Sequence, residues 1–338
     1  MSYDTGCSTS LVTLHAAVRS LQSGDCDVAL VAGVNVMLTP NTSKFFAAIG
    51  GTSAVGHCRS FDASADGYVR SEGIGAVVLR RSSDAVAEEM HMHAMINGVG
   101  VAQDGSSASL MAPNGRAQEN VIRTTLLDAD MEIDHVDYLE AHGTGTALGD
   151  PIEMGAIATV MAGGERDIDA PLSMGAVKAN IGHLEPGAGI AGLIKAVLVL
   201  QHEQAPPIAG FESLNPKIGE VVKGVAVRFP TELESLRERS GKAGATEALV
   251  AGVSSFGYAG TIAHALVSQP EEGLGRPLAS TSRSALAAST TRRRFPWRSL
   301  PTYHIEWVKA PLSTLTLPLS SSQVSSSHLR CREINFGL

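Results

Sequence analysis

Six short, mainly apolar segments most constrain the fold of this 338-residue chain. They are residues 28–34, 73–79, 136–141, 173–177, 248–253 and 263–267. Strands with apolar side chains on both faces occur in sheets that are covered on each side by helices. Helical spacing of apolar residues lies between several of these segments, at residues 8–22, 116–129 and 187–201. The alternation predicts an α/β protein with a largely buried sheet.

Local signals predict several element boundaries. Gly24 follows the first helical segment and is expected to end it. Asp150 is expected to be the N-cap of a further helix, with Pro151 at its first position and Glu153 at its third. Residues 35–72 contain polar patches and are predicted to form a long loop.

The chain divides into three zones. Residues 1–83 and 84–268 contain the strand and helix patterns and are predicted to be two related halves of one catalytic domain. Residues 269–338 are predicted to form a linker or tail that is partly disordered, because Ser and Thr are frequent and Arg292, Arg293 and Arg294 form a charged run. The arginine run is interpreted as a solvated charged segment.

Charge and cysteine content exclude several classes of protein. The net charge of −8 argues against a nucleic-acid partner, since nucleic-acid-binding surfaces are basic. Four cysteines form no disulfide framework, and the N-terminus has no signal peptide, so a reducing, cytoplasmic location is predicted. The most apolar run, residues 188–200, is too short to span a membrane and contains Lys195.

Four segments contain the residue types that chemistry requires. Cys7 in DTGCSTS precedes a predicted helix, whose N-terminus favours a thiolate. His142 in EAHGTGTALGD and His183 in KANIGHLEPGAG each follow a predicted strand, where α/β proteins place reactive side chains. Residues 254–264, SSFGYAGTIAH, form a glycine-rich turn between two strands. Taken singly, each segment also fits a structural role, such as a packing cysteine, a Lys178–Glu185 ion pair or a tight turn.

Taken together, these segments resemble the β-ketoacyl synthase family, and specifically the ketosynthase domain of type I polyketide synthases. The family motifs read approximately DTACSSS, EAHGTGTxxGD, KxNIGHxExAAG and SSFGFxGTNAH, and the four segments occur here in the same order. FDASADGYVRSEG at residues 61–73 resembles the family's FDAxADGYxRGEG, and APNGRAQ at residues 112–118 resembles its APNGxAQ. The resemblance extends over residues 1–268.

The resemblance implies a thiolase-like fold, in which two similar halves form a five-layer αβαβα stack. The family domain extends upstream of its cysteine, whereas Cys7 stands near the start of this chain. An N-terminally truncated domain that lacks much of its first half is therefore expected. The helix at residues 8–22 should then lose packing on one face, and the chain should aggregate, lack activity and not form the family's homodimer.

The resemblance also implies a function for each matched residue. Cys7 would accept an acyl group, and His142 and His183 would hold the carbonyl oxygen of a malonyl thioester during loss of CO₂, beside the oxyanion rather than the thiol proton. The backbone N–H groups of Cys7 and Tyr258 would bind the other oxyanion. Thr144 and Thr146 would bind the pantetheine arm. Lys178 and Glu185 would support the site.

This activity, a 3-oxoacyl-[acyl-carrier-protein] synthase type of acyl transfer in polyketide or fatty-acid biosynthesis, implies a specific partner. Its substrates are attached to the 4′-phosphopantetheine of an acyl carrier protein, and no metal or intrinsically bound cofactor is expected. Two residues depart from the family pattern. Ile262 replaces an asparagine, which predicts a looser turn, and Tyr258 replaces a phenylalanine, whose added hydroxyl needs a partner.

Four alternatives to this assignment differ in their support. Cys7, His142 and His183 could form a zinc site, but their separations of 135 and 41 residues match no structural zinc pattern. A serine hydrolase is not supported, since no G-x-S-x-G occurs. A thiolase would not normally contain both HGTGT and NIGH. The last alternative is a truncated, inactive ketosynthase fragment or interaction module.

Overall fold

The computed structural model describes residues 1–107, 112–242 and 247–270. They belong to one compact unit, Met1–Leu278. Most of the predicted linker or tail, including the arginine run, lies outside the described residues.

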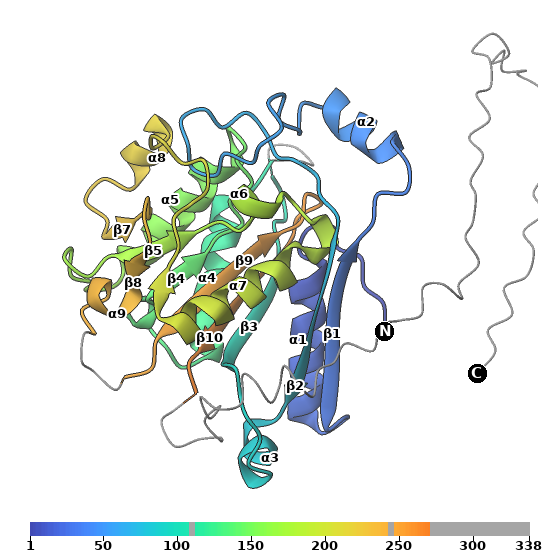
Figure 1. Ribbon diagram of the computed structural model, residues 1–338, viewed down its shortest axis with the longest axis vertical. Coiled ribbons are helices and arrows are strands. Elements are labelled where there is room, and N and C mark those ends of the chain that lie inside the picture. Colours follow the sequence, from blue (N-terminus) through green and yellow to red (C-terminus); the bar gives the residue numbers. More distant parts are fainter. Residues whose placement is uncertain (108–111, 243–246, 271–338) are drawn as a thin grey trace, which may run out of the picture. The chain divides into compact units, whose positions relative to one another are not determined.

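A six-stranded mixed sheet forms the centre of this unit (Figure 1). Its strands, in spatial order, are β3 (Met95–Gln103), β10 (Thr261–Ser268), β9 (Val250–Phe256), β4 (Tyr138–Glu140), β5 (Leu172–Gly175) and β7 (Val227–Arg228). β10 is antiparallel to both β3 and β9, whereas β9, β4, β5 and β7 are mutually parallel. Every residue of β4, β5 and β9 is buried, as the continuous apolar segments predict.

Helices cover both faces of the sheet. On one face lie α1 (Thr9–Ser23) and α7 (Ala188–His202), which also pack against a two-stranded antiparallel ribbon of β1 (Val28–Asn35) and β2 (Gly73–Arg80). On the other face lies α4 (Gly115–Asp128), with α5 (Gly149–Met161) packed beside it. The resulting order of ribbon, helices, sheet and helices corresponds to four successive layers of the expected five-layer stack (Figure 1).

Shorter elements complete the described part of the chain. They are α2 (Asn41–Ala48), α3 (Ser82–Ala87), α6 (Lys178–Ile181), α8 (Pro216–Val221), α9 (Leu236–Arg239), the 3₁₀ turns Ile133–His135 and Glu185–Gly187, and the strand pair β6 (Gln204–Ala205) and β8 (Glu234–Ser235). Within the described residues, no helix combines the length and apolar character needed to cross a membrane.

Most predicted elements are confirmed, but two predictions need correction and one strand was missed. The predicted helix and strand at residues 8–22 and 28–34 match α1 and β1, and Gly24 ends α1 in the left-handed conformation. Asp150 is not an N-cap, because α5 already begins at Gly149. The predicted loop at residues 35–72 contains α2, and β3 was not predicted.

The expected loss of packing around the first helix is also wrong. Leu11, Leu14 and Leu21 of α1 are all buried, because α1 packs between the ribbon and the sheet. The outer face of the ribbon is instead exposed, with Leu30, Ile74 and Val78 at 71%, 74% and 70% of their full exposure. The register places Leu30 opposite Val78, so these side chains form a continuous apolar surface.

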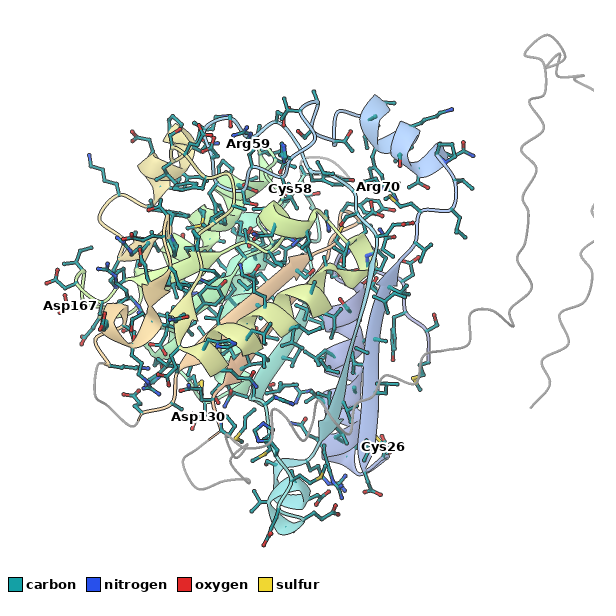
Figure 2. The ribbon with its side chains drawn as sticks, viewed as in Figure 1. Cys26, Cys58, Arg59, Arg70, Asp130 and Asp167 are labelled. Carbon is teal, nitrogen blue, oxygen red and sulfur yellow. The ribbon has the colours of Figure 1, made fainter. Side chains whose placement is uncertain are left out.

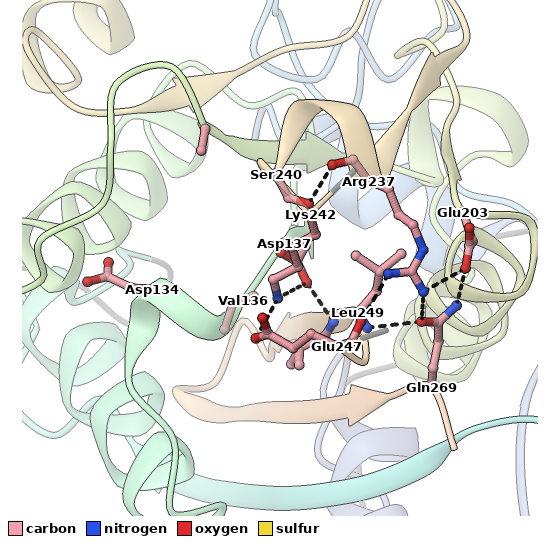
Figure 3. Close-up of polar contacts among 12 residues, drawn as sticks. Asp134, Val136, Asp137, Glu203, Arg237, Ser240, Lys242, Glu247, Leu249 and Gln269 are labelled. Atoms are coloured by element: carbon pink, nitrogen blue, oxygen red, sulfur yellow. Dashed lines mark hydrogen bonds and ion pairs between the residues drawn. The ribbon is translucent and has the colours of Figure 1, made fainter. Parts of the chain in front are cut away.

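A network of hydrogen bonds and ion pairs stabilises the end of the sheet at which β4 begins (Figure 3). The buried Asp137 accepts hydrogen bonds from Lys242 Nζ at 3.0 Å and from the Val250 N–H at 2.8 Å. Nearby, Gln269 accepts from the Leu249 N–H and from Arg237. These contacts hold together the starts of β4 and β9 and the end of β10. The candidate site lies at the opposite end of β4.

Candidate active site

Cys7 lies immediately before α1, in a turn closed by a hydrogen bond from the Thr9 N–H to the Gly6 carbonyl oxygen. The Ser255 hydroxyl of β9 donates to the Cys7 carbonyl oxygen at 2.7 Å, so the half-buried cysteine is anchored to the central sheet. Cys26 and Cys58 are also free thiols, but neither precedes a helix. Figure 2 shows Cys58 near the level of Arg70 and Cys26 at the opposite end of the ribbon.

His183 lies beside this cysteine, which corrects the expectation that neither histidine would lie beside the thiol. Its Nε2 is 3.1 Å from the Cys7 Sγ, and its Nδ1 accepts the Glu185 N–H at 3.0 Å. Because Nδ1 is an acceptor, the neutral ring carries its proton on Nε2 and presents an N–H to the sulfur. Burial, with the charges of Lys178 and Arg70, holds the pKa of His183 well below its usual range, which keeps the ring neutral.

His142 lies in the same arrangement. It follows β4, and its Nδ1 accepts the Phe256 N–H at 3.3 Å, so its Nε2 also carries the proton. Burial, together with Lys178 and His183, holds the pKa of His142 well below its usual range. The two imidazole rings are nearly perpendicular, with centroids 5.6 Å apart. The site therefore contains two neutral imidazoles that are both N–H donors at Nε2.

A cavity of about 390 Å³ brings the predicted residues together. Its lining includes Cys7, His142, His183, Thr144, Thr146, Glu185 and Tyr258. Phe45 and Phe46 of α2 also border it, so the segment predicted as a loop contributes an apolar wall. Lys178 is buried at the start of α6 and contributes its charge to both histidines.

The thiol of Cys7 is protonated at neutral pH. Burial raises its pKa to about 11, and the Glu185 carboxylate raises it as well. Lys178 and the backbone N–H groups of Tyr258 and Cys7 act in the opposite direction. The sequence-based prediction of a thiolate stabilised by the helix N-terminus is therefore wrong, because burial outweighs that stabilisation.

The glycine-rich turn after β9 allows Tyr258 to approach Cys7. A side chain at Gly257 would place its Cβ 2.3 Å from the Thr5 carbonyl oxygen, so only glycine fits there. The turn is closed by hydrogen bonds between Gly257 and Thr261 and between Gly260 and Gly257. Ile262 is fully buried in the core, and the expected loosening of the turn stays a prediction. The Tyr258 side chain is 45% exposed, so water can bind its hydroxyl.

Thr144 and Thr146 lie on the loop between β4 and α5, with their hydroxyl oxygens 3.2 Å apart. Gly145 between them has a φ of +76°, and a Cβ there would lie 2.8 Å from the Arg59 nitrogen. The loop therefore packs closely against residues 58–61 while both hydroxyls border the cavity. This geometry agrees with the close backbone approach that the glycines predicted.

Glu185 forms its ion pair with Arg70 rather than with Lys178. The Arg70 guanidinium binds both carboxylate oxygens, with Nη2 at 2.8 Å from Oε2, and its Nη1 donates to the Ser43 hydroxyl. Arg70 belongs to FDASADGYVRSEG, but that motif alone assigned it no function. Since Glu185 also orients His183 through its backbone, Arg70 supports the site indirectly.

Two buried carboxylates were likewise missed, because Asp150 and Glu153 were interpreted as helix caps. Glu153 accepts the N–H groups of His142 and Gly143 at 2.7 and 2.8 Å, and Asp150 accepts those of Phe61 and Gly145 at 2.7 and 3.1 Å. Burial raises their pKa values to about 7 and about 6. Their place in EAHGTGTALGDPIE, directly after the histidine motif, was the available signal.

Comparisons with known proteins agree with the motifs. The family model described as "Beta-ketoacyl synthase, N-terminal domain" matches residues 1–85, and "Beta-ketoacyl synthase, C-terminal domain" matches residues 93–212. A phenolphthiocerol/phthiocerol polyketide synthase of Mycobacterium bovis is 41% identical over 345 residues, which is 100% of this chain and 17% of that protein. The 6-methylsalicylic acid synthase of Aspergillus niger is 43% identical over 268 residues, 79% of this chain and 15% of that protein.

Solved structures of ketosynthases share the fold. The ketosynthase from module 6 of the bacillaene synthase of Bacillus subtilis 168 is 36% identical with a TM-score of 0.73, over 79% of this chain and 46% of that one. The oxazolomycin ketosynthase domain from Streptomyces albus is 36% identical with a TM-score of 0.76, over 80% and 46%. The chain thus spans less than half of these structures and about a sixth of the mycobacterial protein. The expected thiolase-like α/β fold is confirmed.

Proposed function

Because the chain belongs to the β-ketoacyl synthase family, we propose that it performs the condensing step of polyketide synthesis. Cys7 takes an acyl group from a phosphopantetheine thioester of an acyl carrier protein, and the proton of Cys7 leaves with the released pantetheine thiol. A malonyl-type thioester then loses CO₂. Its carbanion attacks the acyl carbonyl, and Cys7 departs from a new β-ketoacyl thioester.

One observation carries this proposal: both histidines present an N–H at Nε2, because both Nδ1 atoms accept backbone N–H groups. Loss of CO₂ leaves negative charge on the thioester oxygen of the extender unit. Two fixed N–H donors in a water-poor cavity stabilise such charge without reorganising. Imidazolium would also donate, but the lowered pKa values favour neutral rings.

The cysteine chemistry uses a second set of donors. The backbone N–H groups of Cys7 and Tyr258 both act on the sulfur of Cys7. We propose that they bind the carbonyl oxygen of the acyl group as it becomes tetrahedral. His183, whose N–H also faces the sulfur, stabilises the thiolate when it is formed and when it departs.

The hydroxyls of Thr144 and Thr146 are proposed to bind the amides of the pantetheine arm, because both border the cavity. This chemistry requires an acyl carrier protein as the partner. The proposed location of the reaction is the cytoplasm. A role as an inactive interaction module is not favoured, since Cys7, His142 and His183 converge on one cavity.

Substitution of the histidines tests the proposal. In His142→Ala and His183→Ala, decarboxylation of a malonyl thioester should fall by about 10²–10³-fold, the usual effect of removing one oxyanion donor. Acylation of Cys7, followed by mass spectrometry, should fall less in His142→Ala, whereas it should fall as well in His183→Ala because His183 also faces the sulfur. His202→Ala, at the end of α7, is the matched control. If either active-site variant decarboxylated at the parental rate, that histidine would be wrongly assigned.

A further inference from the structure

The segment that joins α3 to β3 contains an unusual density of nitrogen and sulfur donors. Met90, His91, Met92 and His93 are consecutive, and Met95 is the first residue of β3. Thioethers are soft ligands and imidazoles are borderline ones, so this set favours a soft cation. The candidate active site uses none of these residues.

The two histidines are close to each other. Their ring centroids are 4.8 Å apart and the ring planes lie at 87°. An ion bound by both rings would lie about 2 Å from one nitrogen of each, the length of metal–nitrogen bonds in proteins.

The surrounding structure holds this segment in place. All five donor residues border a cavity of about 630 Å³, whose wall also includes Val18 and Leu21 of α1. The Gln201 amide of α7 contacts the His93 ring at 2.8 Å and donates to the His93 carbonyl oxygen at 3.3 Å. The segment is thus in contact with α7, and α1 forms part of the cavity wall.

The charged groups at the cavity are already paired. Arg80 forms an ion pair with Glu88, and Arg81 binds Asp27 and Asp84, so their positive charge is largely neutralised. Arg80 also contacts the Met90 sulfur at 3.3 Å. Met92 and Met95 are the other thioethers that border the cavity.

The donor set determines which metal is expected. Across residues 1–107, 112–242 and 247–270, no group of three or more His, Cys, Asp and Glu side chains is arranged to hold a metal ion. Two imidazoles with one thioether suit Cu(I), which accepts soft ligands at low coordination number. We propose that His91, His93 and the thioether of Met92 or Met95 form a Cu(I) site.

This site lies apart from the acyl-transfer cavity. α2, which borders that cavity, follows β1, whereas the Met-His segment follows α3 at the other end of the antiparallel ribbon (Figure 1). Cu(I) at His91 and His93 therefore need not displace substrate.

Methionine-methyl NMR of the full chain tests the proposal. The protein is labelled with ¹³C at the methionine methyl groups and titrated anaerobically with Cu(I), to one equivalent beyond one per cysteine, so that thiols do not mask the site. The methyl signal of Met92 or Met95 should shift, while those of the buried Met154 and Met174 should not. Competition with bathocuproine disulfonate should show that His91→Gln weakens Cu(I) binding by about tenfold or more.

His57→Gln, which changes an exposed histidine elsewhere, should leave both readouts unchanged. Cys26→Ser should leave the methyl shifts unchanged, which separates this site from the nearby thiol. The proposal is overturned if Met92 and Met95 remain unshifted, or if their shifts persist in His91→Gln protein that retains the parental unfolding transition.

Discussion

The position of Cys7 before a helix favours a thiolate, whereas its buried surroundings favour the protonated thiol. Its turn leads directly into α1, and Lys178 and two backbone N–H groups lower the pKa of the thiol. Burial nevertheless dominates and raises the pKa to about 11. The thiol therefore stays protonated until an acyl donor arrives, and Lys178 limits how far the pKa rises.

The rate of alkylation of Cys7 measures how burial and Lys178 together set the pKa of its thiol. Iodoacetamide reacts with the thiolate, so the rate at Cys7 should rise about tenfold per pH unit between pH 8 and 10, where the pH stays below the pKa of Cys7. Lys178→Met removes a nearby positive charge, so it should raise the pKa further and lower the rate at pH 9 by about tenfold. Mass spectrometry of the Cys7 peptide follows the reaction, with the exposed Lys217→Met as control. Equal rates in both variants would contradict the assigned effect of Lys178.

At the scale of elements, the connection from β4 to α5 depends on two buried carboxylates. Glu153 lies within α5, yet it binds the backbone of His142 and Gly143 at the end of β4. It thereby fixes the turn that aims His142 at the cavity. Helix-cap rules identified Asp150 and Glu153 as significant, but they could not reveal partners outside the helix.

Glu153 should make stability depend on pH. Its pKa is raised from 4.5 to about 7, so the folded chain holds this proton more tightly than the unfolded chain does. The associated stabilisation is complete below pH 4.5 and is lost as the pH rises to about 7. Between these values the free energy of unfolding should fall by on the order of 3 kcal/mol from this group alone.

Urea unfolding between these two pH values measures that loss. Glu153→Gln cannot titrate, so this component of the pH dependence should disappear in the variant. Glu165→Gln, at an exposed site, should retain it. An identical pH dependence in wild-type protein and Glu153→Gln would refute the assignment.

For the whole molecule, the sequence predicted the layers of helices and strands better than it predicted where each helix or strand begins and ends. Continuous apolar segments identified β1, β2, β9 and β10. Burial on both faces explains this signal in β9 and β10, whereas β1 and β2 are equally apolar although their outer face is exposed. β3 escaped prediction because Gly98 and Gly100 weaken its pattern. Those glycines allow α4 to pack closely, as a Cβ at Gly100 would lie 2.3 Å from the Thr125 hydroxyl.

The candidate site was predicted from motifs, but its contacts were not. Cys7, His142 and His183 are far apart in the sequence and meet only because β4, β9 and α1 bring them together. The 3.1 Å approach of His183 to the sulfur and the Arg70–Glu185 pair depend on that packing. The expected aggregation remains a prediction, and the exposed apolar ribbon face of Leu30, Ile74 and Val78 gives it a structural basis.

In the proposed reaction, Cys7 carries the acyl group that is condensed with a decarboxylated extender unit. The most direct measurement is intact-protein and peptide mass spectrometry in two stages. A properly folded form of the chain is first incubated with an acyl thioester and then with a malonyl-loaded acyl carrier protein. An acyl adduct should appear on Cys7 and then disappear as a β-ketoacyl product forms on the carrier. An adduct on Cys26 or Cys58 with none on Cys7, or a Cys7 adduct that the malonyl carrier never discharges, would contradict it.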